Sequence, residues 1–279
     1  MQKKKTKEKK PKRERESPKP QEATVYIIGD AQVVMEYVSL CTSHGYVTVY
    51  DWNEPPANAP AFDVKSARRS AQIPRNVSFA LELTNIDLHR KRKNLELLDR
   101  TLPATTAIAS TSLTISATEQ SSWVRHKSRL VGCCALPSLG ERPLVEIAPT
   151  VFSPTETLQV VQRFFHSVGK EIELVQDRVG MVLPRILCQI INEAVFALQE
   201  EIAAPQDIDM AMKLGAKYPA GPVEWADRIG MQQVYAVLLA LQRDLGEERY
   251  RVAPLLRQMA VSATWWQHPS ATVEERQSQ

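Results

Sequence analysis

The chain has 279 residues, of which 43% are hydrophobic and 24% are charged. This length and composition are typical of a soluble protein with one large or two modest domains. No uninterrupted apolar run approaches the roughly 20 residues that a membrane-spanning helix needs. We therefore expect no membrane-spanning segment and no membrane partner.

The net charge of +3 is unevenly distributed along the chain. Residues 1–20 hold ten Lys or Arg against three Glu, a charge of +7, so the remaining residues together carry −4. Because residues 1–23 have almost no apolar side chains, we predict a disordered, solvated basic tail. No aromatic residues are interleaved with these basic ones for base stacking, so nucleic acid is not the expected partner.

The four cysteines are Cys41, Cys133, Cys134 and Cys188, and none has the C-x-x-C spacing of a zinc site. We interpret them as reduced, buried thiols in a cytoplasmic protein. No metal site is predicted.

The first half of the chain alternates predicted strands with predicted helices. Thr24 to Gly29 is a β-branched, apolar run that ends in Gly, which indicates a buried strand. A helix is predicted from Val33 to His44, and a second strand from Tyr46 to Tyr50, ending at Asp51. This strand–helix–strand order predicts parallel pairing through a right-handed crossover.

The same alternation continues to about residue 177. Asp87 is the predicted N-cap of a charged helix that ends near Arg100, and Ser153 with Glu156 would form a capping box at the start of a helix ending at Gly169. Further strands are predicted at residues 77–83, 106–110, 130–135, 144–148 and 171–175, and a Pro-rich loop at 53–61. Residues 24–177 are therefore predicted to form an α/β Rossmann-like domain.

The sequence beyond residue 178 has a helical pattern throughout. Apolar residues recur at three- and four-residue steps between 182 and 198, and a stripe this wide must pack on other helices or on a second subunit. Its members are Val182, Leu183, Ile186, Leu187, Ile190, Ile191, Ala194 and Leu198. Pro205 would begin the next helix and Gly215 would end it. After a Pro/Gly turn, another apolar helix is predicted from Met231 to Leu245.

This pattern predicts an all-α domain over residues 178–262. A flexible tail would follow over residues 263–279. The expected architecture is an α/β Rossmann-like N-terminal domain followed by an all-α C-terminal domain.

The first strand, Gly29, a helix and Asp51 follow the layout of a dinucleotide site. The fingerprint G-x-G-x-x-G needs each Gly for a physical reason: a tight turn, close approach to the pyrophosphate, and helix–strand packing. Here the sequence from residue 29 is GDAQVV, so Ala31 and Val34 replace the second and third Gly, and Asp30 adds a negative charge. Asp51 could accept ribose hydroxyls. Two interpretations stay open, an NAD site or a Rossmann sheet kept as a scaffold.

The block from residue 179 to 230 contains a long amphipathic helix, a second helix and two Gly/Pro turns. This order resembles the C-terminal domain of the 3-hydroxyacyl-CoA dehydrogenase family, and the resemblance extends over about residues 24–260. It implies NAD-dependent oxidation of 3-hydroxyacyl-CoA in fatty-acid metabolism, with NAD as cofactor and acyl-CoA as ligand. It also implies a homodimer formed through the C-terminal helices.

The resemblance also assigns positions to the family's catalytic residues. The sequence RLVGCCALPS at 129–138, followed by PLVE at 143–146, is similar to the family's GMHFFNP … LVE stretch. Cys134 stands where the family has its general-base His, and Glu146 matches the Glu that orients that His. Thr111 or Ser112 would supply the substrate-contacting hydroxyl, and Pro184 stands where the family has its active-site Asn.

These departures predict that hydride transfer is lost or altered. A positioned general base contributes roughly 10²–10⁴-fold to the rate, and a thiol with an ordinary pKa of about 8.5 is mostly neutral at pH 7. The segment between Asp51 and Val77 is also shorter than the family's helical crossover, and the family's Gly-rich ending is absent after Met259.

Two alternatives remain open at this stage. Glu146, Thr111, Ser112 and Asp51 would support an active but divergent dehydrogenase. The apolar stripe at 182–198 would support a non-catalytic homodimeric scaffold. A role for Cys134 as a nucleophile would need a nearby His, and the five His have no recognisable arrangement.

Overall fold

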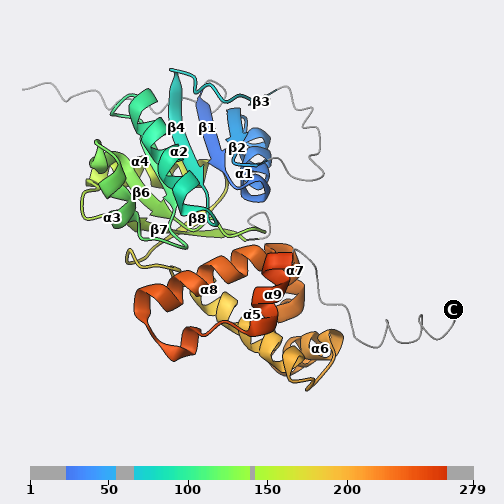
Figure 1. The fold of residues 1–279 in the computed structure, drawn as a ribbon. Coiled ribbons are helices and arrows are strands. Elements are labelled where there is room, and N and C mark those ends of the chain that lie inside the picture. The colour runs from blue at the N-terminus through green and yellow to red at the C-terminus, as the bar shows by residue number, and fades with distance from the viewer. Residues whose placement is uncertain (1–22, 55–65, 139–141, 263–279) are drawn as a thin grey trace, which may run out of the picture.

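The structure is a computed structural model that describes residues 23–54, 66–138 and 142–262. The predicted C-terminal tail, nearly all of the N-terminal tail and most of the predicted loop at 53–61 lie outside these ranges. Within them the chain forms a sheet flanked by helices, followed by a layer of helices at one end of the sheet (Figure 1).

In the described residues the sheet has eight strands in the order β3-β2-β1-β4-β5-β6-β7-β8. The strands are β1 (Thr24–Gly29), β2 (Val47–Trp52), β3 (Ala67–Arg69), β4 (Val77–Leu83), β5 (Ala107–Thr111), β6 (Leu130–Cys133), β7 (Leu144–Pro149) and β8 (Glu171–Leu174). β6 and β7 are antiparallel, whereas the other neighbouring pairs are parallel. β1 is buried along its whole length, as expected for a central parallel strand.

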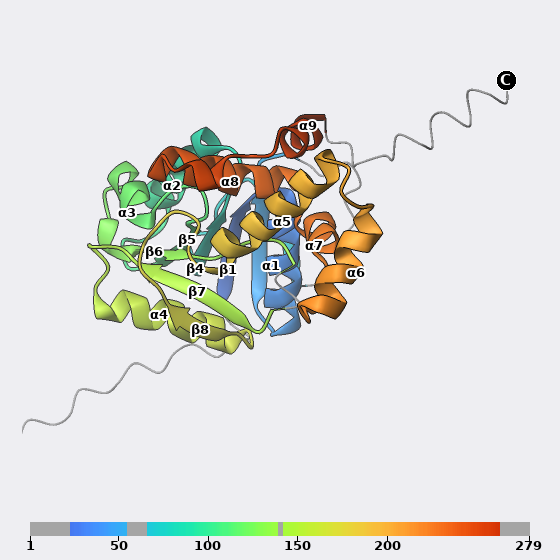
Figure 2. The same cartoon turned by 90° about the horizontal axis from the view of Figure 1, so that it is seen from below.

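Helices cover both faces of this sheet, as Figure 2 shows from below. They are α1 (Ala31–Ser43), α2 (Leu88–Thr101), the short α3 (Ala117–Gln120) and α4 (Thr155–Ser167), with 3₁₀ helices at Ser121–Trp123 and Lys127–Arg129. One apolar core joins α1 and α4 to the sheet and includes Val34 and Phe164. Leu95 and Leu98 of α2 belong to a second core with Tyr26 of β1, on the opposite face.

The C-terminal domain is helical throughout its described residues. Its helices are α5 (Leu183–Gln199), α6 (Pro205–Gly215), α7 (Pro222–Ile229), α8 (Met231–Leu245) and α9 (Pro254–Ser262), with a 3₁₀ helix at Glu248–Tyr250. Their apolar core also contains Leu113, Cys134 and Ala148 from the sheet domain. The two domains therefore share one continuous core at their junction.

The predicted fold class is confirmed, an α/β Rossmann-like domain followed by an all-α domain. β1, β4 and α8 have the predicted bounds, and Asp87 caps α2 by accepting from the backbone N–H groups of His89 and Arg90. No helix in the described part of the chain has the length and apolar character that crossing a membrane requires.

Two sequence predictions about the helices are wrong. The expected capping box does not form, because α4 begins at Thr155 and the Ser153 hydroxyl instead donates to the Leu130 carbonyl at 2.6 Å. Residues 219–222 were predicted as a turn before the 231–245 helix, but Pro222 begins a separate helix, α7. Pro is well suited to a first helical turn, where its missing N–H has no partner to lose.

Candidate functional site

The strand order places a crevice between the carboxyl ends of β1 and β4. From β1 the sheet extends through β2 and β3 on one side and through β4 and β5 on the other. The position between β1 and β4 is therefore the topological switch point, where open α/β sheets bind ligands. A cavity of about 560 Å³ lies here, between the sheet domain and helices α7 and α8. Residues that line it include Asp30, Asn53, Ile86, Arg90, Asp227 and Gln233.

Gly29 is held at this crevice by a close backbone contact. Its φ is +152°, and a Cβ added here would lie 2.4 Å from the carbonyl carbon of Leu83. Only Gly tolerates such an approach between β1 and β4. Ala31, the first residue of α1, lines the cavity where the fingerprint has its second Gly.

Asp51 is engaged outside the cavity. Its carboxylate accepts from Nε of Arg69 at 3.3 Å, and the Arg69 guanidinium lies 4.5 Å from the centroid of the Trp52 ring. The residues after β2 that line the cavity are instead Asn53 and Glu54. Asp51, predicted to accept ribose hydroxyls, lies one residue before the end of β2, contacts the Arg69 side chain and is not among the residues that line the cavity.

Asp30 bridges the two sides of the crevice. Its Oδ2 accepts from the backbone N–H groups of Asn85 at 2.8 Å and Ile86 at 3.2 Å, and from Gln233 Nε2 at 3.2 Å. Its Oδ1 accepts from Asn53 Nδ2 at 3.2 Å. Burial raises the pKa of the Asp30 carboxyl, and the hydrogen bonds from Asn85, Gln233 and Ile86 only partly oppose this shift. The sequence alone indicated a negative charge at position 30. It did not indicate the hydrogen-bond partners of Asp30, which come from distant segments of the chain.

The crevice has backbone features of a dinucleotide site, but its charges do not suit a pyrophosphate. Gly29 allows close backbone approach, and the N-terminus of α1, which has no side-chain cap, is oriented as an anion site. The carboxylate of Asp30 lies against that anion site. Glu54, Asp87 and Asp227 also line the cavity, with Arg90 as a cation.

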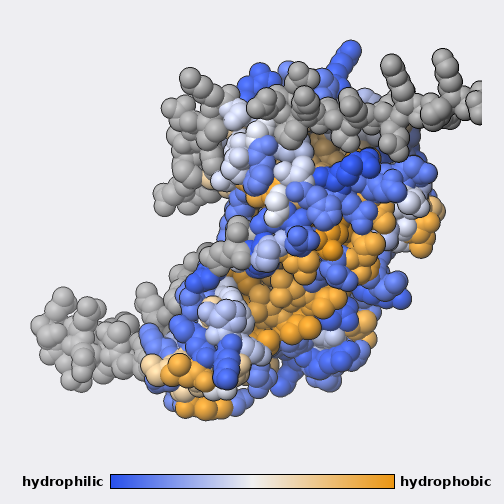
Figure 3. All heavy atoms as spheres, turned by 180° about the vertical axis from the view of Figure 1, so that it is seen from behind, coloured by the Kyte–Doolittle hydropathy of each residue, from blue (hydrophilic) through white to orange (hydrophobic). Residues whose placement is uncertain are grey.

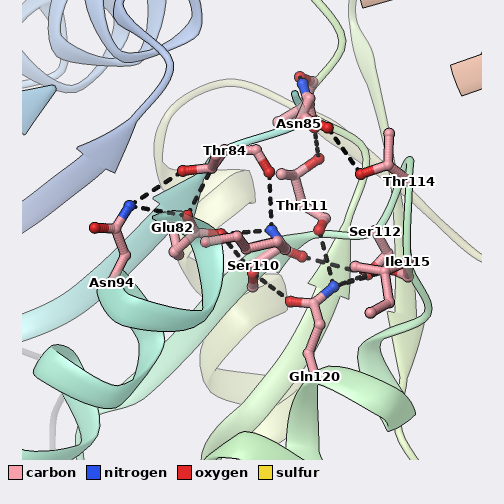
Figure 4. Close-up of polar contacts among 12 residues, drawn as sticks. Glu82, Thr84, Asn85, Asn94, Ser110, Thr111, Ser112, Thr114, Ile115 and Gln120 are labelled. Atoms are coloured by element: carbon pink, nitrogen blue, oxygen red, sulfur yellow. Dashed lines mark hydrogen bonds and ion pairs between the residues drawn. The ribbon is translucent and has the colours of Figure 1, made fainter. Parts of the chain in front are cut away.

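A buried polar network lies behind the crevice at the ends of β4 and β5 (Figure 4). Glu82 is fully buried and accepts from Lys91 Nζ at 2.5 Å and from Ser110 Oγ at 2.9 Å. Asn94 Nδ2 joins Asn53 and Thr84 to the same group. This network satisfies its charges internally, which a buried ion pair requires.

The predicted substrate-contacting hydroxyls are part of this network. Thr111 Oγ1 donates to Asn85 Oδ1 at 2.7 Å, while Gln120 Nε2 lies 3.4 Å from Ser112 Oγ and donates to the Thr111 carbonyl at 3.0 Å. Both Thr111 and Ser112 are buried, and neither lines the cavity at the crevice. Each hydroxyl is therefore directed into protein.

Cys134 directly follows β6 and packs into the core at the domain junction. Burial raises the pKa of its thiol to about 12; the charge of Glu146 acts in the same direction and Arg142 opposes it. The four cysteines are free and buried, as predicted. With its pKa raised this far, the Cys134 thiol is expected to be protonated at pH 7.

Glu146, on β7, holds the N-terminus of α5. Its Oε2 accepts from the backbone N–H of Val182 at 2.8 Å, and its Oε1 accepts from that of Leu183 at 2.7 Å. A carboxylate at a helix N-terminus satisfies otherwise unpaired N–H groups and interacts favourably with the helix dipole. Pro184 follows in the first turn of α5 and is buried. The structure thus brings Cys134, Glu146 and the start of α5 together, but as a junction between domains.

The chain is similar to two models of one protein family. The model described as "3-hydroxyacyl-CoA dehydrogenase, NAD binding domain" matches residues 53–178, and "3-hydroxyacyl-CoA dehydrogenase, C-terminal domain" matches residues 180–266. The first match begins after β2, so β1 and the segment at residues 29–34, which includes the start of α1, precede it.

Individual relatives agree with these matches. A probable 3-hydroxybutyryl-CoA dehydrogenase of Bacillus subtilis is 31% identical over 68% of this chain and 66% of its own length. The 3-hydroxyadipyl-CoA dehydrogenase of Escherichia coli is 41% identical over 42% of this chain and 25% of its own length. The matches therefore span less than two thirds of these curated relatives.

Solved structures share the fold over most of the chain. The crystal structure of (S)-3-hydroxybutyryl-CoA dehydrogenase PaaH1 from Ralstonia eutropha has a TM-score of 0.71 at 25% identity, covering 86% of this chain and 94% of that one. M. tuberculosis FadB2 has a TM-score of 0.74 at 18% identity, covering 86% of this chain and 93% of that one, and it supports the fold alone.

We predict that the Glu146→Gln substitution destabilises the protein. The amide keeps one acceptor oxygen but turns an NH₂ group toward a backbone N–H and removes the charge at the N-terminus of α5. The free energy of unfolding should fall by about 1–3 kcal/mol in urea titrations. The Glu171→Gln variant, on the exposed start of β8, is the control and should change by less than about 0.5 kcal/mol. Equal stability of the Glu146→Gln variant and the wild type would contradict the helix-capping role.

Proposed function

The chain belongs to the 3-hydroxyacyl-CoA dehydrogenase family, and we propose that it binds NAD(H) and acyl-CoA but has lost or altered the family's hydride transfer. The two family models follow one another along the chain and include the NAD-binding domain of the family. The main support for this proposal is the buried Cys134 thiol, whose pKa burial raises to about 12. The neighbouring Glu146 carboxylate accepts two backbone N–H groups at the start of α5.

The proposed binding uses the crevice at the carboxyl ends of β1 and β4. Gly29, Ala31 and the N-terminus of α1 would hold the dinucleotide, which when bound supplies the hydride acceptor. Oxidation of a 3-hydroxyl group also needs a protein group that takes the hydroxyl proton. We propose that neither Cys134 nor Glu146 takes that proton, because burial keeps the Cys134 thiol protonated at pH 7 and two backbone N–H groups hold Glu146 at the start of α5.

A second cavity next to the crevice supports acyl-CoA as the other ligand. Its volume is about 580 Å³, and it lies between the β4–α2 and β5–α3 connections and helices α8 and α9. Leu88, Tyr235 and Leu239 contribute to its mainly apolar lining, and it shares Ile86 and Gln232 with the first cavity. We assign it to the acyl portion, with the nucleotide in the neighbouring crevice.

The four free, buried cysteines support a cytoplasmic location, because thiols stay reduced there.

The proposal predicts very slow reduction of acetoacetyl-CoA by NADH. The rate, followed by NADH absorbance, should be at least about 10²-fold below that of PaaH1 from Ralstonia eutropha assayed in parallel, because a positioned base contributes 10²–10⁴-fold. A Cys134→His variant should stay slow, because Glu146 is bound to α5 and Pro184 offers no amide. A wild-type rate similar to that of PaaH1 would instead favour the active, divergent dehydrogenase.

We also propose a homodimer formed through the C-terminal helices. The apolar stripe of α5 divides into an inner row, with Leu187 and Ile191 buried, and an outer row, with Leu183 and Ile186 exposed. Figure 3 shows a broad apolar area on the side of the molecule opposite the view of Figure 1, over the helical domain and its junction with the sheet domain. Exposed apolar areas of this kind favour burial against another protein surface.

The dimer is tested by light scattering at micromolar concentration. The wild type should have about twice the chain mass of 31.4 kDa, and Ile186→Glu should yield monomers, because a charge would be buried at the contact. The Val151→Glu variant, which changes an exposed apolar residue of the sheet domain, should remain dimeric. A monomeric wild type would contradict the dimer and the scaffold role with it.

A further inference from the structure

Asp30 occupies the place in this fold where an anionic ligand would meet the protein. It lies between Gly29, which ends β1, and the first turn of α1. In doubly wound sheets the pyrophosphate of a dinucleotide lies at this helix N-terminus, within the switch-point crevice. Here the Asp30 carboxylate already accepts the N–H groups of Asn85 and Ile86 across the crevice. A protein carboxylate therefore takes donors that a bound phosphate could use.

The helical domain holds this carboxylate in place. Gln233 of α8 donates to Asp30 Oδ2, and Gln32 of α1 donates to the carbonyl of Arg228 at 3.0 Å. Gln233 is 97% buried and lines the cavity, and its Oε1 has no hydrogen-bond partner among the described residues. An unpaired buried acceptor favours a ligand that brings a donor, such as a ribose hydroxyl or an adenine amino group.

The charges around Asp30 also disfavour phosphate. Among the described residues, four charged ones line the cavity together with Asp30: Glu54 after β2, Asp87 and Arg90 at the start of α2, and Asp227 on α7. Glu82 on β4 does not line the cavity, but its charge acts on Asp30. Glu82 is neutralised by Lys91. What remains around Asp30 is three carboxylates and one guanidinium, so a phosphate entering this space meets a net negative charge.

We propose that Asp30 determines which nucleotides the crevice binds: it admits the adenosine portion and opposes the pyrophosphate until its carboxylate is neutralised. This inference rests on the proposed NAD site and identifies the residue that controls its affinity. Its expected consequence is weak dinucleotide binding at neutral pH. It also predicts that removing one charge restores strong binding.

The pH dependence has a defined sign. Burial raises the pKa of Asp30, so its carboxyl takes up a proton at a higher pH than an ordinary Asp does. As the pH falls toward this raised pKa, the fraction of neutral Asp30 rises and the pyrophosphate is opposed less. Dinucleotide affinity should therefore increase as the pH falls. Adenosine, which carries no phosphate, should not show this change.

The experiment compares adenosine with ADP-ribose by calorimetric titration of the full-length protein at pH 8 and pH 6. The pyrophosphate of ADP-ribose does not titrate in this range, so a change in affinity reports on the protein. For the wild type, ADP-ribose should bind more tightly at pH 6 than at pH 8, because the pKa of Asp30 is raised. For Asp30→Asn, ADP-ribose should bind at least about tenfold more tightly than to the wild type at pH 8, and its affinity should depend less on pH than that of the wild type. Adenosine affinity should stay within about twofold throughout.

Asp227→Asn is the matched control. It removes one carboxylate from the same cavity, on the side formed by α7, without touching the donors of Asn85 and Ile86, and should change ADP-ribose affinity by less than about threefold. An equal gain for Asp227→Asn would mean that the general field matters and not Asp30, and this would overturn the proposal. A wild-type affinity for ADP-ribose that is the same at both pH values, with no gain in Asp30→Asn, would also overturn it.

These outcomes separate this inference from the proposed function. If the wild type binds ADP-ribose well at pH 8 and Asp30→Asn adds nothing, the role of Asp30 is wrong, while dinucleotide binding stands. If neither protein binds ADP-ribose at either pH, both the role of Asp30 and the proposed dinucleotide site are wrong. Because the wild-type comparison between pH values needs no variant, it tests the proposal even if Asp30→Asn is unstable.

Discussion

The carboxylate of Glu146 binds two backbone N–H groups at the start of α5, and the junction between the domains depends on this contact. Glu146 is 6% exposed, so its charge would be costly without donors. The free N–H groups of a helix N-terminus supply them. Around this contact, Cys134 and Leu113 of the sheet domain pack in one core with α5 and α8. The polar contact and the apolar core together fix the helical layer against the sheet.

This arrangement determines what the junction can do chemically. Both carboxylate oxygens of Glu146 accept N–H groups of α5, so this helix fixes the orientation of the side chain. Its negative charge also adds to the effect of burial in raising the pKa of Cys134. Pro184, in the first turn of α5, offers no side-chain amide. Cys134, Glu146 and Pro184 thus all have structural roles at the junction between the domains.

The sequence predicted the fold more completely than the site. The apolar, β-branched sequences of β1 and β4 predicted both strands correctly, because the local preference for extended backbone agrees with their burial in the sheet. The prediction that Ser153 caps α4 was wrong, because its hydroxyl donates to the Leu130 carbonyl on β6. The spacing of residues along the chain does not reveal such a contact. In the same way, Asp30 was visible as a charge, but its bridge to Asn85 and Gln233 depends on segments 55 and 203 residues away.

The central claim is that no ionised base stands at position 134 at neutral pH, and a direct titration of that thiol tests it. Thiolate absorbance near 240 nm would be recorded from pH 6 to pH 10 for the native wild type and for a Cys134→Ser variant, and the difference assigned to Cys134. A pKa of about 12 predicts no difference below pH 10. A thiolate that appears with a midpoint near pH 7 would contradict the account, because Cys134 would then be able to take a proton from substrate.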